Sequence, residues 1–509
     1  MDGGDGNTGT DRVRVVGQLL GQAGEYGVVT GLSRTIGVAR QTLYRWRERG
    51  RAAVEAAFAP VAPAPVATPD LTRRILTTLV AGHASDRGIQ DCLAAEGRAV
   101  SLGTVAGVVQ AAEQRALRVM AAPAAVGPRV LALDEIYGNN RHGATLSVVD
   151  ALSGAVWATA GPVAVDGESW TLLLWEVQAR GLRWAGTVSD GGLAMQQACA
   201  VVDPEGRHQR DIWHVLHVCA QVQGRLDRWV RSLEAQTATV ARQAARVAAG
   251  GRARGKQPRT DMAEHASFVA HAQAIAAALA YLTGELRRLL GVVVLTPGGL
   301  MDSATRRTEL ETLLLLLADL RHQAPALPQA ELTRLHKHLT GALPGLLTFT
   351  PAPGTRVRVL AHEQWGQTLG SAHLALVAWA WQRRAVLGPS TEQLLAGFPE
   401  DWRPAARVLL NTWDATVRAS SLVENWHSLL RPHLAVHRTL SPGLLALLAV
   451  YHNHQVASRG AHAGLSPFQR SGLNEAPTDW LVALGYQSAH HACPTSVTAH
   501  PSDVQSEVA

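Results

Sequence analysis

Three carboxylates in this sequence stand where they could hold metal ions. Asp134 interrupts the apolar run "LALDEIYG", Asp190 lies in "TVSDGG", and Glu424 is the acid of "SLVENWHSLLRPHL". An acid inside an apolar segment is costly to bury unless it is paired or coordinates a metal. Carboxylate oxygens are hard ligands of the kind that Mg²⁺ prefers. If the three side chains meet in space, the sequence predicts a magnesium site.

Such a site suits the cleavage and joining of phosphodiesters. Two divalent ions about 3.5–4 Å apart can activate a nucleophile and stabilise the leaving oxygen. Asp134 would then bridge two Mg²⁺ ions, for which Mn²⁺ could substitute, while Asp190 and Glu424 would each complete one metal site. Each acid also has a structural alternative on its own, because Asp before Gly-Gly is a good turn signal.

Other polar residues lie close to these acids in the sequence. Glu135 should point to the opposite face of its strand from Asp134 and is not expected to be a ligand. Asp150 and Asp211 are the acids most easily mistaken for the first two members of the set. Asp211 and His214 are expected to support the site or to contact DNA near the scissile bond. For His214 the alternative is a packed histidine on a short strand.

The acid of the third segment lies on a predicted helix. The apolar residues of that helix recur at helical spacing and form one stripe: Leu422, Val423, Trp426, Leu429 and Leu430. Glu424 projects from the other side, which it shares with Asn425, Ser428 and Arg431. Alone, this is a solvated face; it becomes a metal-binding face only if it borders Asp134 and Asp190. Asn425 and Arg431 would then support the site, and Arg431 is either a DNA phosphate contact or a surface charge.

Residues 129–217 have the pattern that could bring the acids together. Three segments that alternate and are rich in branched residues predict three neighbouring antiparallel strands: "RVLALDEIYG", "GATLSVVDALSG" and "AVWATAGPVA". A helical segment follows, then a fourth strand that ends at Asp190, a second helix and a fifth short strand. The predicted order is βββαβαβ.

The N-terminal residues 1–58 predict a helix-turn-helix unit. One helix should end near Ile36 and Gly37, and the next should begin around Ala39 with Leu43 and Trp46 buried. Its polar residues are long side chains able to reach bases and phosphates: Arg40, Gln41, Thr42, Tyr44, Arg45 and Arg47. A plain helical hairpin with a solvated basic face is the alternative.

The rest of the chain divides by composition. A Pro/Ala-rich linker covers 59–69, and 70–120 is a second helical unit, either another DNA reader or a packing helix. Residues 218–410 predict an all-helical insertion, 411–473 the final helices with Glu424, and 488–509 a disordered tail. Three tryptophans of the insertion could stack a base, although core packing is the commoner role: Trp365, Trp379 and Trp381.

Composition restricts the class of protein. The chain has 509 residues, 47 Lys plus Arg against 41 Asp plus Glu, and four cysteines without CxxC pairing. A mildly basic balance favours a polyanionic partner, and scattered cysteines favour a reducing compartment. The polar N-terminus is unlike a signal peptide, and apolar runs such as "HLALVAWAW" are short for a membrane span. We therefore expect a cytoplasmic, nucleoid-associated protein without a membrane partner.

Together these features resemble the DDE transposases of bacterial insertion sequences, whose core is RNase H-like. In such a core strands one and four are neighbours, so Asp134 and Asp190 would converge, and Glu424 would come from a late helix. "DIWH" resembles the (C/D)xxH signature after the second catalytic Asp of Mutator-like transposases. In that group a helical insertion separates the second Asp from the Glu, and here 424 − 190 = 234 residues do so.

The resemblance implies a fold and an activity. The fold would be an α/β RNase H-like core with a mixed five-stranded sheet and a large all-α insertion, preceded by small all-α helix-turn-helix units. The chain would bind terminal inverted repeats in double-stranded DNA and catalyse Mg²⁺-dependent cleavage and strand transfer into target DNA, as a homodimer or higher oligomer. Two alternatives stay open: an RNase H-like nuclease without strand transfer, and an inactive DNA-binding regulator derived from a transposase.

Overall fold

The computed structural model divides the chain into two compact units, Met1–Thr68 and Pro69–Ala509. The residues that the structure describes are 9–22, 27–58, 68–123, 126–138, 143–252, 261–296, 299–349, 355–357, 359–360, 363, 372–387, 391–437, 439–458 and 463–487. The predicted tail at 488–509, most of the linker at 59–69 and Trp365 lie outside them.

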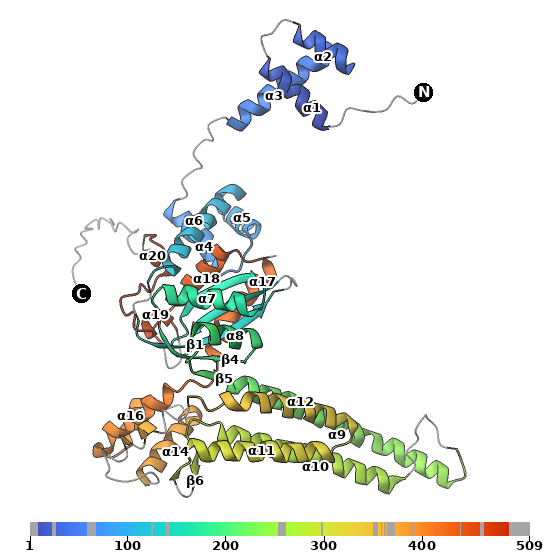
Figure 1. The fold of residues 1–509 in the computed structure, drawn as a ribbon, viewed down its shortest axis with the longest axis vertical. Helices are drawn as coiled ribbons and strands as arrows, with labels where there is room; N and C mark the ends of the chain where they lie inside the picture. Colours follow the sequence, from blue (N-terminus) through green and yellow to red (C-terminus); the bar gives the residue numbers. More distant parts are fainter. Residues whose placement is uncertain are drawn as a thin grey trace, which may run out of the picture. The chain divides into compact units, whose positions relative to one another are not determined.

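The first unit contains three helices (Figure 1): α1 (Gly9–Gly21), α2 (Val28–Ile36) and α3 (Arg40–Phe58). Gly37 takes a positive φ of 66° at the end of α2, a conformation that favours glycine. Leu43 is fully buried and packs with Val15 and Leu19, and Trp46 lies half-buried against them. The predicted break between the two helices is therefore confirmed.

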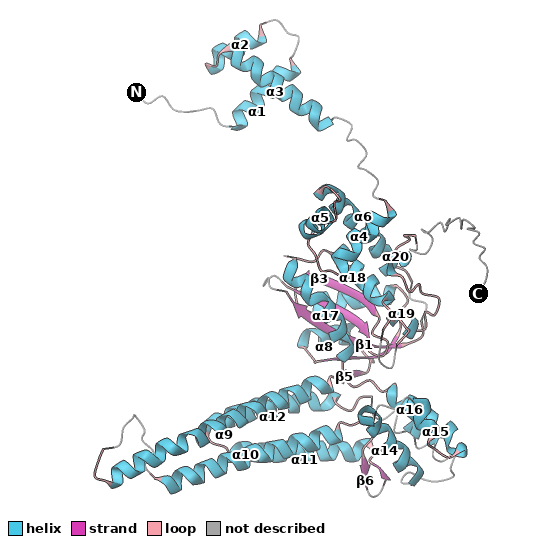
Figure 2. Ribbon diagram, turned by 180° about the vertical axis from the view of Figure 1, so that it is seen from behind, coloured by secondary structure: helices cyan, strands magenta, loops and turns pink. Residues whose placement is uncertain are grey.

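A mixed five-stranded sheet forms the centre of the second unit, in magenta in Figure 2. Its strands are β1 (Arg129–Tyr137), β2 (Ala144–Asp150), β3 (Val156–Val163), β4 (Trp184–Ser189) and β5 (His208–Arg210). The spatial order is β3-β2-β1-β4-β5. The first three strands are antiparallel neighbours, and β4 and β5 run parallel to β1. The mixed sheet and the adjacency of strands one and four were both predicted.

Helices cover both faces of this sheet. On one face, α7 (Gly167–Ala179) and α8 (Leu193–Val202) pack Trp170 and Met195 against Leu131 and Leu133. The opposite face carries Ala132 and Ile136 of β1 and is covered by α17 (Ser421–Val436) and α18 (Pro442–His454). Three further helices share this core, with α6 (Leu102–Met120) packed on α18, and α4 (Pro69–Val80) and α5 (Asp86–Ala95) packed on α6. The short α19 (Pro467–Arg470) and α20 (Trp480–Ala483) complete this part.

The helices of the second predicted helical unit share the core of the sheet. Ser101 caps α6 by accepting a hydrogen bond from the Thr104 backbone N–H at 3.0 Å, and Gly97 precedes it with φ 77°. Along α6, Val105 and Ala112 are buried in the same core as the leucines of α18. This arrangement favours the packing-helix alternative for α6.

The insertion consists mainly of long helices. A bundle is formed by α9 (Ile212–Ala248), α10 (Met262–Leu289), α11 (Ser303–Gln323) and α12 (Ala326–Ala342). A second core joins α14 (Ala372–Leu387), α15 (Thr391–Ala396) and α16 (Arg403–Asp414), with the 3-10 turns η1 (Leu343–Gly345) and η2 (Glu400–Trp402) nearby in the chain.

Two predictions about the insertion need correction. The strands β6 (Leu295–Thr296) and β7 (Gly299–Leu300) pair, so the insertion is not entirely helical, and its first helix begins at Ile212.

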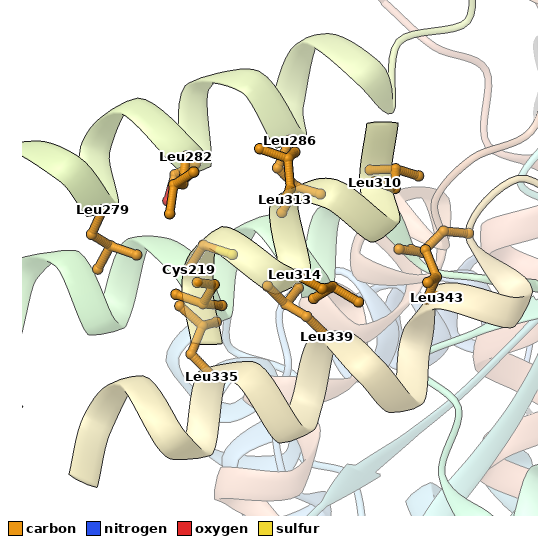
Figure 3. A pocket seen from close by; sticks show the side chains of 13 residues that line it. Cys219, Leu279, Leu282, Leu286, Leu310, Leu313, Leu314, Leu335, Leu339 and Leu343 are labelled. Atoms are coloured by element: carbon orange, nitrogen blue, oxygen red, sulfur yellow. The ribbon is translucent and has the colours of Figure 1, made fainter. Parts of the chain in front are cut away.

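The interior of the bundle is apolar. Leucines of α10, α11 and α12 point with Cys219 of α9 into a cavity of only about 30 Å³ (Figure 3), far below the ~300–1,000 Å³ of ligand sites. By length and composition alone α10 could cross a membrane. Its buried Ile275 and Leu279 nevertheless pack in the bundle, so we read it as a core helix.

Candidate metal centre

Asp134 lies on the sheet face that α17 covers. Along β1, Leu131 and Leu133 are buried beneath α7, whereas Ala132 and Ile136 belong to the core that contains α17. Because side chains alternate along a strand, Asp134 shares its face with Ala132 and Ile136. The same alternation sends Glu135 toward the other face, as predicted.

Trp426 fixes α17 against the sheet. Its indole is fully buried, and its Nε1–H donates a hydrogen bond to Ser147 Oγ at 3.0 Å. Ser147 is the β2 residue that pairs directly with Asp134. The contact therefore anchors the helix beside Asp134. Glu424 and His427, two residues before and one after Trp426 in the sequence, are carried to the same place.

Asp134, Glu424 and His427 form a group that could hold a metal ion. Each offers one ligand atom, and these atoms lie within 4.8 Å of one another. His427 Nδ1 is 3.7 Å from Asp134 Oδ2. The structure thus brings together two of the three predicted acids and adds a histidine that the sequence argument did not name.

His427 was not named from the sequence, where it belonged neither to the apolar stripe of its helix nor to the polar side. It is buried, and burial lowers the pKa of its imidazole to about 4, so its contact with Asp134 is not an ion pair at neutral pH. Its Nε2 has no hydrogen-bond partner among the described residues. The available signal was the spacing of Glu424 and His427, three residues apart on a helix and therefore on one face.

Asp190 lies at the end of β4, beside β1. Ala132 pairs with Val188 in the parallel register, and two further residues along each strand lead to Asp134 and Asp190. Asp190 Oδ1 accepts a hydrogen bond from the Gly192 backbone N–H at 2.8 Å, which is the turn role weighed from the sequence. Its charge still acts on Asp134, so it belongs to the same electrostatic neighbourhood, although not to the three-residue group.

Two buried acids of this neighbourhood, Asp134 and Glu135, resist ionisation. Burial, together with the charges of Glu135, Asp190 and Glu424, raises the pKa of Asp134 to about 7, against one hydrogen bond from the Glu135 backbone. Burial and the charge of Asp190 likewise raise the pKa of Glu135 to about 7. The Oε2 atom of Glu135 is buried without a partner in the described part of the chain. A cation placed here would relieve this repulsion.

Glu424 is paired at the surface. Arg431 Nη2 donates to Glu424 Oε2 at 2.6 Å, and both side chains are about half exposed. Exposed ion pairs contribute only about 0–1 kcal/mol, so the pair leaves Glu424 able to exchange its partner. Arg431 was predicted as a DNA contact or a surface charge, and Asn425 is exposed beside Glu424.

Asp150 and Asp211 have structural roles. Asp150 Oδ1 accepts hydrogen bonds from the Leu152 and Ser153 backbone in the turn after β2. Asp211 caps α9 by accepting from the His214 backbone N–H at 3.1 Å, and its other oxygen accepts from the backbone and hydroxyl of Ser420. Asp211 thereby ties the start of α9 to the residue that precedes α17, and so supports the site through the fold.

A basic group lies beside Asp190. The Arg210 guanidinium occupies the space that a side chain on Gly191 would need. The pKa of His338 is lowered, chiefly by burial and also by the charges of Arg210 and His214. The charge of Asp190 acts on His338 in the opposite sense, so the four residues share one electrostatic neighbourhood. His214 lies in the first turn of α9, which corrects the alternative that placed it on a strand, because Asp211 caps a helix there.

The predicted DNA-reading side chains of α3 are mostly exposed. Arg40, Gln41, Tyr44 and Arg45 are exposed, and Thr42 and Arg47 are half-buried, with the Arg47 guanidinium 5.1 Å from the centre of the Tyr44 ring.

In the insertion, the indole N–H of Trp381 donates a hydrogen bond to Asp414 at 2.9 Å, and the ring packs on Trp413. That contact favours a structural role for Trp381, whereas Trp379 is 53% exposed.

The donor set fits a divalent ion. Two carboxylates with hard oxygens suit Mg²⁺, and the neutral imidazole of His427 also suits Mn²⁺. The elevated pKa of Asp134 is a feature that a bound cation would relieve.

No protein-family model matches this chain, and no curated protein matches it either.

Proposed function

We propose that the chain is a DDE-type transposase with an RNase H-like core. It would bind element ends in double-stranded DNA, cut them in a Mg²⁺-dependent reaction, and join them to target DNA as a homodimer or larger assembly in the cytoplasm. The observation that carries the proposal is the meeting of Asp134 on β1 with Glu424 on α17, 290 positions apart (424 − 134 = 290), beside Asp190 at the end of β4.

The sheet supports the RNase H-like part of this proposal. Three antiparallel strands are followed by two parallel ones, and the first strand lies between the second and the fourth. That order is what the resemblance requires if acids on strands one and four are to converge. The long helical insertion between Asp190 and Glu424 also has the place that the resemblance assigns to it.

Each residue has a role in this reaction. Bound divalent ions would supply activation of the nucleophile and stabilisation of the leaving oxygen. Asp134 would hold both ions because the charges of both other acids act on it, and Asp190 and Glu424 would each hold one. His427 stays neutral and orients the Asp134 carboxylate. Arg210 and His214 lie where they could bind the phosphate that is cut.

One observation favours the alternative of an inactive DNA-binding regulator. Glu424 forms an ion pair with Arg431. An exposed pair of this kind is weak, whereas a divalent cation offers two charges. The proposal therefore expects Arg431 to release Glu424 when the ion binds.

A cleavage assay tests the proposed function. The substrates are duplexes that cover the DNA on either side of the chain's own coding sequence, with a supercoiled plasmid as target. Wild type should nick the duplexes and join them to the plasmid with Mg²⁺. Asp134→Asn, Asp190→Asn and Glu424→Gln should each lose about 100-fold or more, because charge stabilisation by metals is worth several kcal/mol.

Asp302→Asn is the matched control, since Asp302 is an exposed acid that caps α11. It should cut like wild type. Nicking without joining would favour the nuclease alternative. If the catalytic variants cut as well as wild type does, the proposed active site is wrong.

A further inference from the structure

Trp213 is a large aromatic side chain left open to solvent. It lies in the first turn of α9 and is 53% exposed. One face of its indole stacks on His217, one helical turn later, with ring centres 4.8 Å apart and planes 9° from parallel. His217 is held in turn by Gln221, with 2.9 Å between their side-chain nitrogens. The His217 ring thus supports one face of the indole.

The Trp213 indole lies next to the basic group beside Asp190, which consists of Arg210, His214 and His338. His214 follows it in the chain, and the two rings meet edge to face with 6.3 Å between their centres. Arg210 and His214 both lower the pKa of His338, and Asp190 acts on it in the opposite sense. A phosphate drawn to this group would leave its neighbouring base within reach of Trp213.

We infer that Trp213 is a stacking platform for an unpaired nucleobase of the DNA strand that enters the site. This inference rests on the proposed function, because it takes that strand as the ligand. Aromatic rings stack any base, and the interaction is independent of sequence. Hydrophobic docking of a protein would also use an exposed indole, but the cations beside it favour a polyanion.

A binding experiment without catalysis tests the platform. The probes are a labelled 20-nucleotide oligothymidylate and an abasic oligonucleotide of the same length and charge, both in EDTA. Wild type should prefer the base-bearing strand. Trp213→Ala should lower that preference about fivefold or more, which is the usual effect of removing one stacking ring, and leave abasic binding unchanged. Trp213→Phe should keep part of the preference.

Trp175→Ala is the control, because Trp175 is a similarly exposed tryptophan, at 48%, on a different helix, α7. It should bind like wild type. An unchanged preference in Trp213→Ala overturns the platform while DNA binding itself survives. Failure of wild type to bind any DNA would overturn both the platform and the proposed function. Because the binding assay is done in EDTA, without metal, it does not depend on cleavage. A protein that has lost cleavage therefore still tests the platform.

Discussion

The elevated pKa of the acids predicts a pH dependence of stability. Burial raises the pKa of Asp134 and Glu135 to about 7, so between their ordinary values and pH 7 the folded state holds more protons than the unfolded state. The free energy of unfolding should therefore fall as pH rises through 7. Most of this fall lies below pH 7, where histidines also titrate. Above pH 7 histidines with ordinary pKa values are largely neutral, so the step from pH 7 to 8.5 isolates the last part of the fall.

Urea unfolding in EDTA at these two pH values measures the effect. Wild type should lose stability between them, and Asp134→Asn should lose less because it removes one of the two acids. Mg²⁺ should stabilise wild type more at pH 8.5 than at pH 7. A wild-type protein that gains stability over this window would contradict the burial argument.

At the scale of single residues, the sequence was sufficient for Asp134 but not for His427. An acid in an apolar strand predicts a special role, because burying a lone carboxylate is costly. His427 gave no comparable signal. Its position against Asp134 depends on how α17 docks, which the helix sequence does not encode by itself.

A second prediction concerns His427 as a neutral ligand or positioning residue. His427→Gln keeps the size but removes the ring nitrogen near Asp134. Affinity for Mn²⁺ should fall about 10–100-fold, the usual cost of disturbing a metal's supporting residues, and affinity for Mg²⁺ should fall less. Calorimetric titration with both ions decides this; equal losses for the two would argue against direct contact with the imidazole.

At the scale of elements, the strand pattern was the most informative part of the sequence. Alternation predicted the three antiparallel strands and the order βββαβαβ, whereas the mixed character of the sheet was an implication of the resemblance. The start of α9 was placed too late because Asp211 was considered as an acid near the site, whereas its carboxylate caps the helix. The two-residue strands β6 and β7 are too short to leave a periodic signal.

The docking of α17 predicts a measurable coupling. Trp426→Phe removes the donor to Ser147 and leaves a buried hydroxyl without its partner, so the free energy of unfolding should fall by about 1–3 kcal/mol. In a variant that already carries Trp426→Phe, the further change Ser147→Ala should lower the free energy of unfolding only a little more, because the hydrogen bond between the two side chains is already lost. Denaturant unfolding of both single variants and the double variant gives the coupling; strictly additive losses would show that the bond does not anchor the helix.

At the scale of the whole molecule, the division into two compact units predicts separable functions. A chain that begins at Pro69 should keep its fold and its metal binding, since the sheet, α17 and α18 all lie in the second unit. It should lose most of its preference for specific duplexes, because α3 carries the exposed polar residues. Circular dichroism and duplex competition assays compare the two chains. Undiminished specificity would place DNA recognition elsewhere.

The helical insertion marks the limit of sequence reasoning at this scale. Periodicity predicted its helices, yet which helices pair depends on side-chain packing among many leucines of similar size. The bundle of α9 to α12 and the separate core of α14 to α16 could therefore not be told apart beforehand.

Titration of the metal-free chain with Mn²⁺, followed by electron paramagnetic resonance, tests most directly whether these carboxylates share divalent ions. Wild type and Asp302→Asn should bind with equal affinity. Asp134→Asn should bind at least about 100-fold more weakly, and Asp190→Asn and Glu424→Gln should each weaken binding as well. Identical Mn²⁺ binding by wild type and Asp134→Asn would contradict the account.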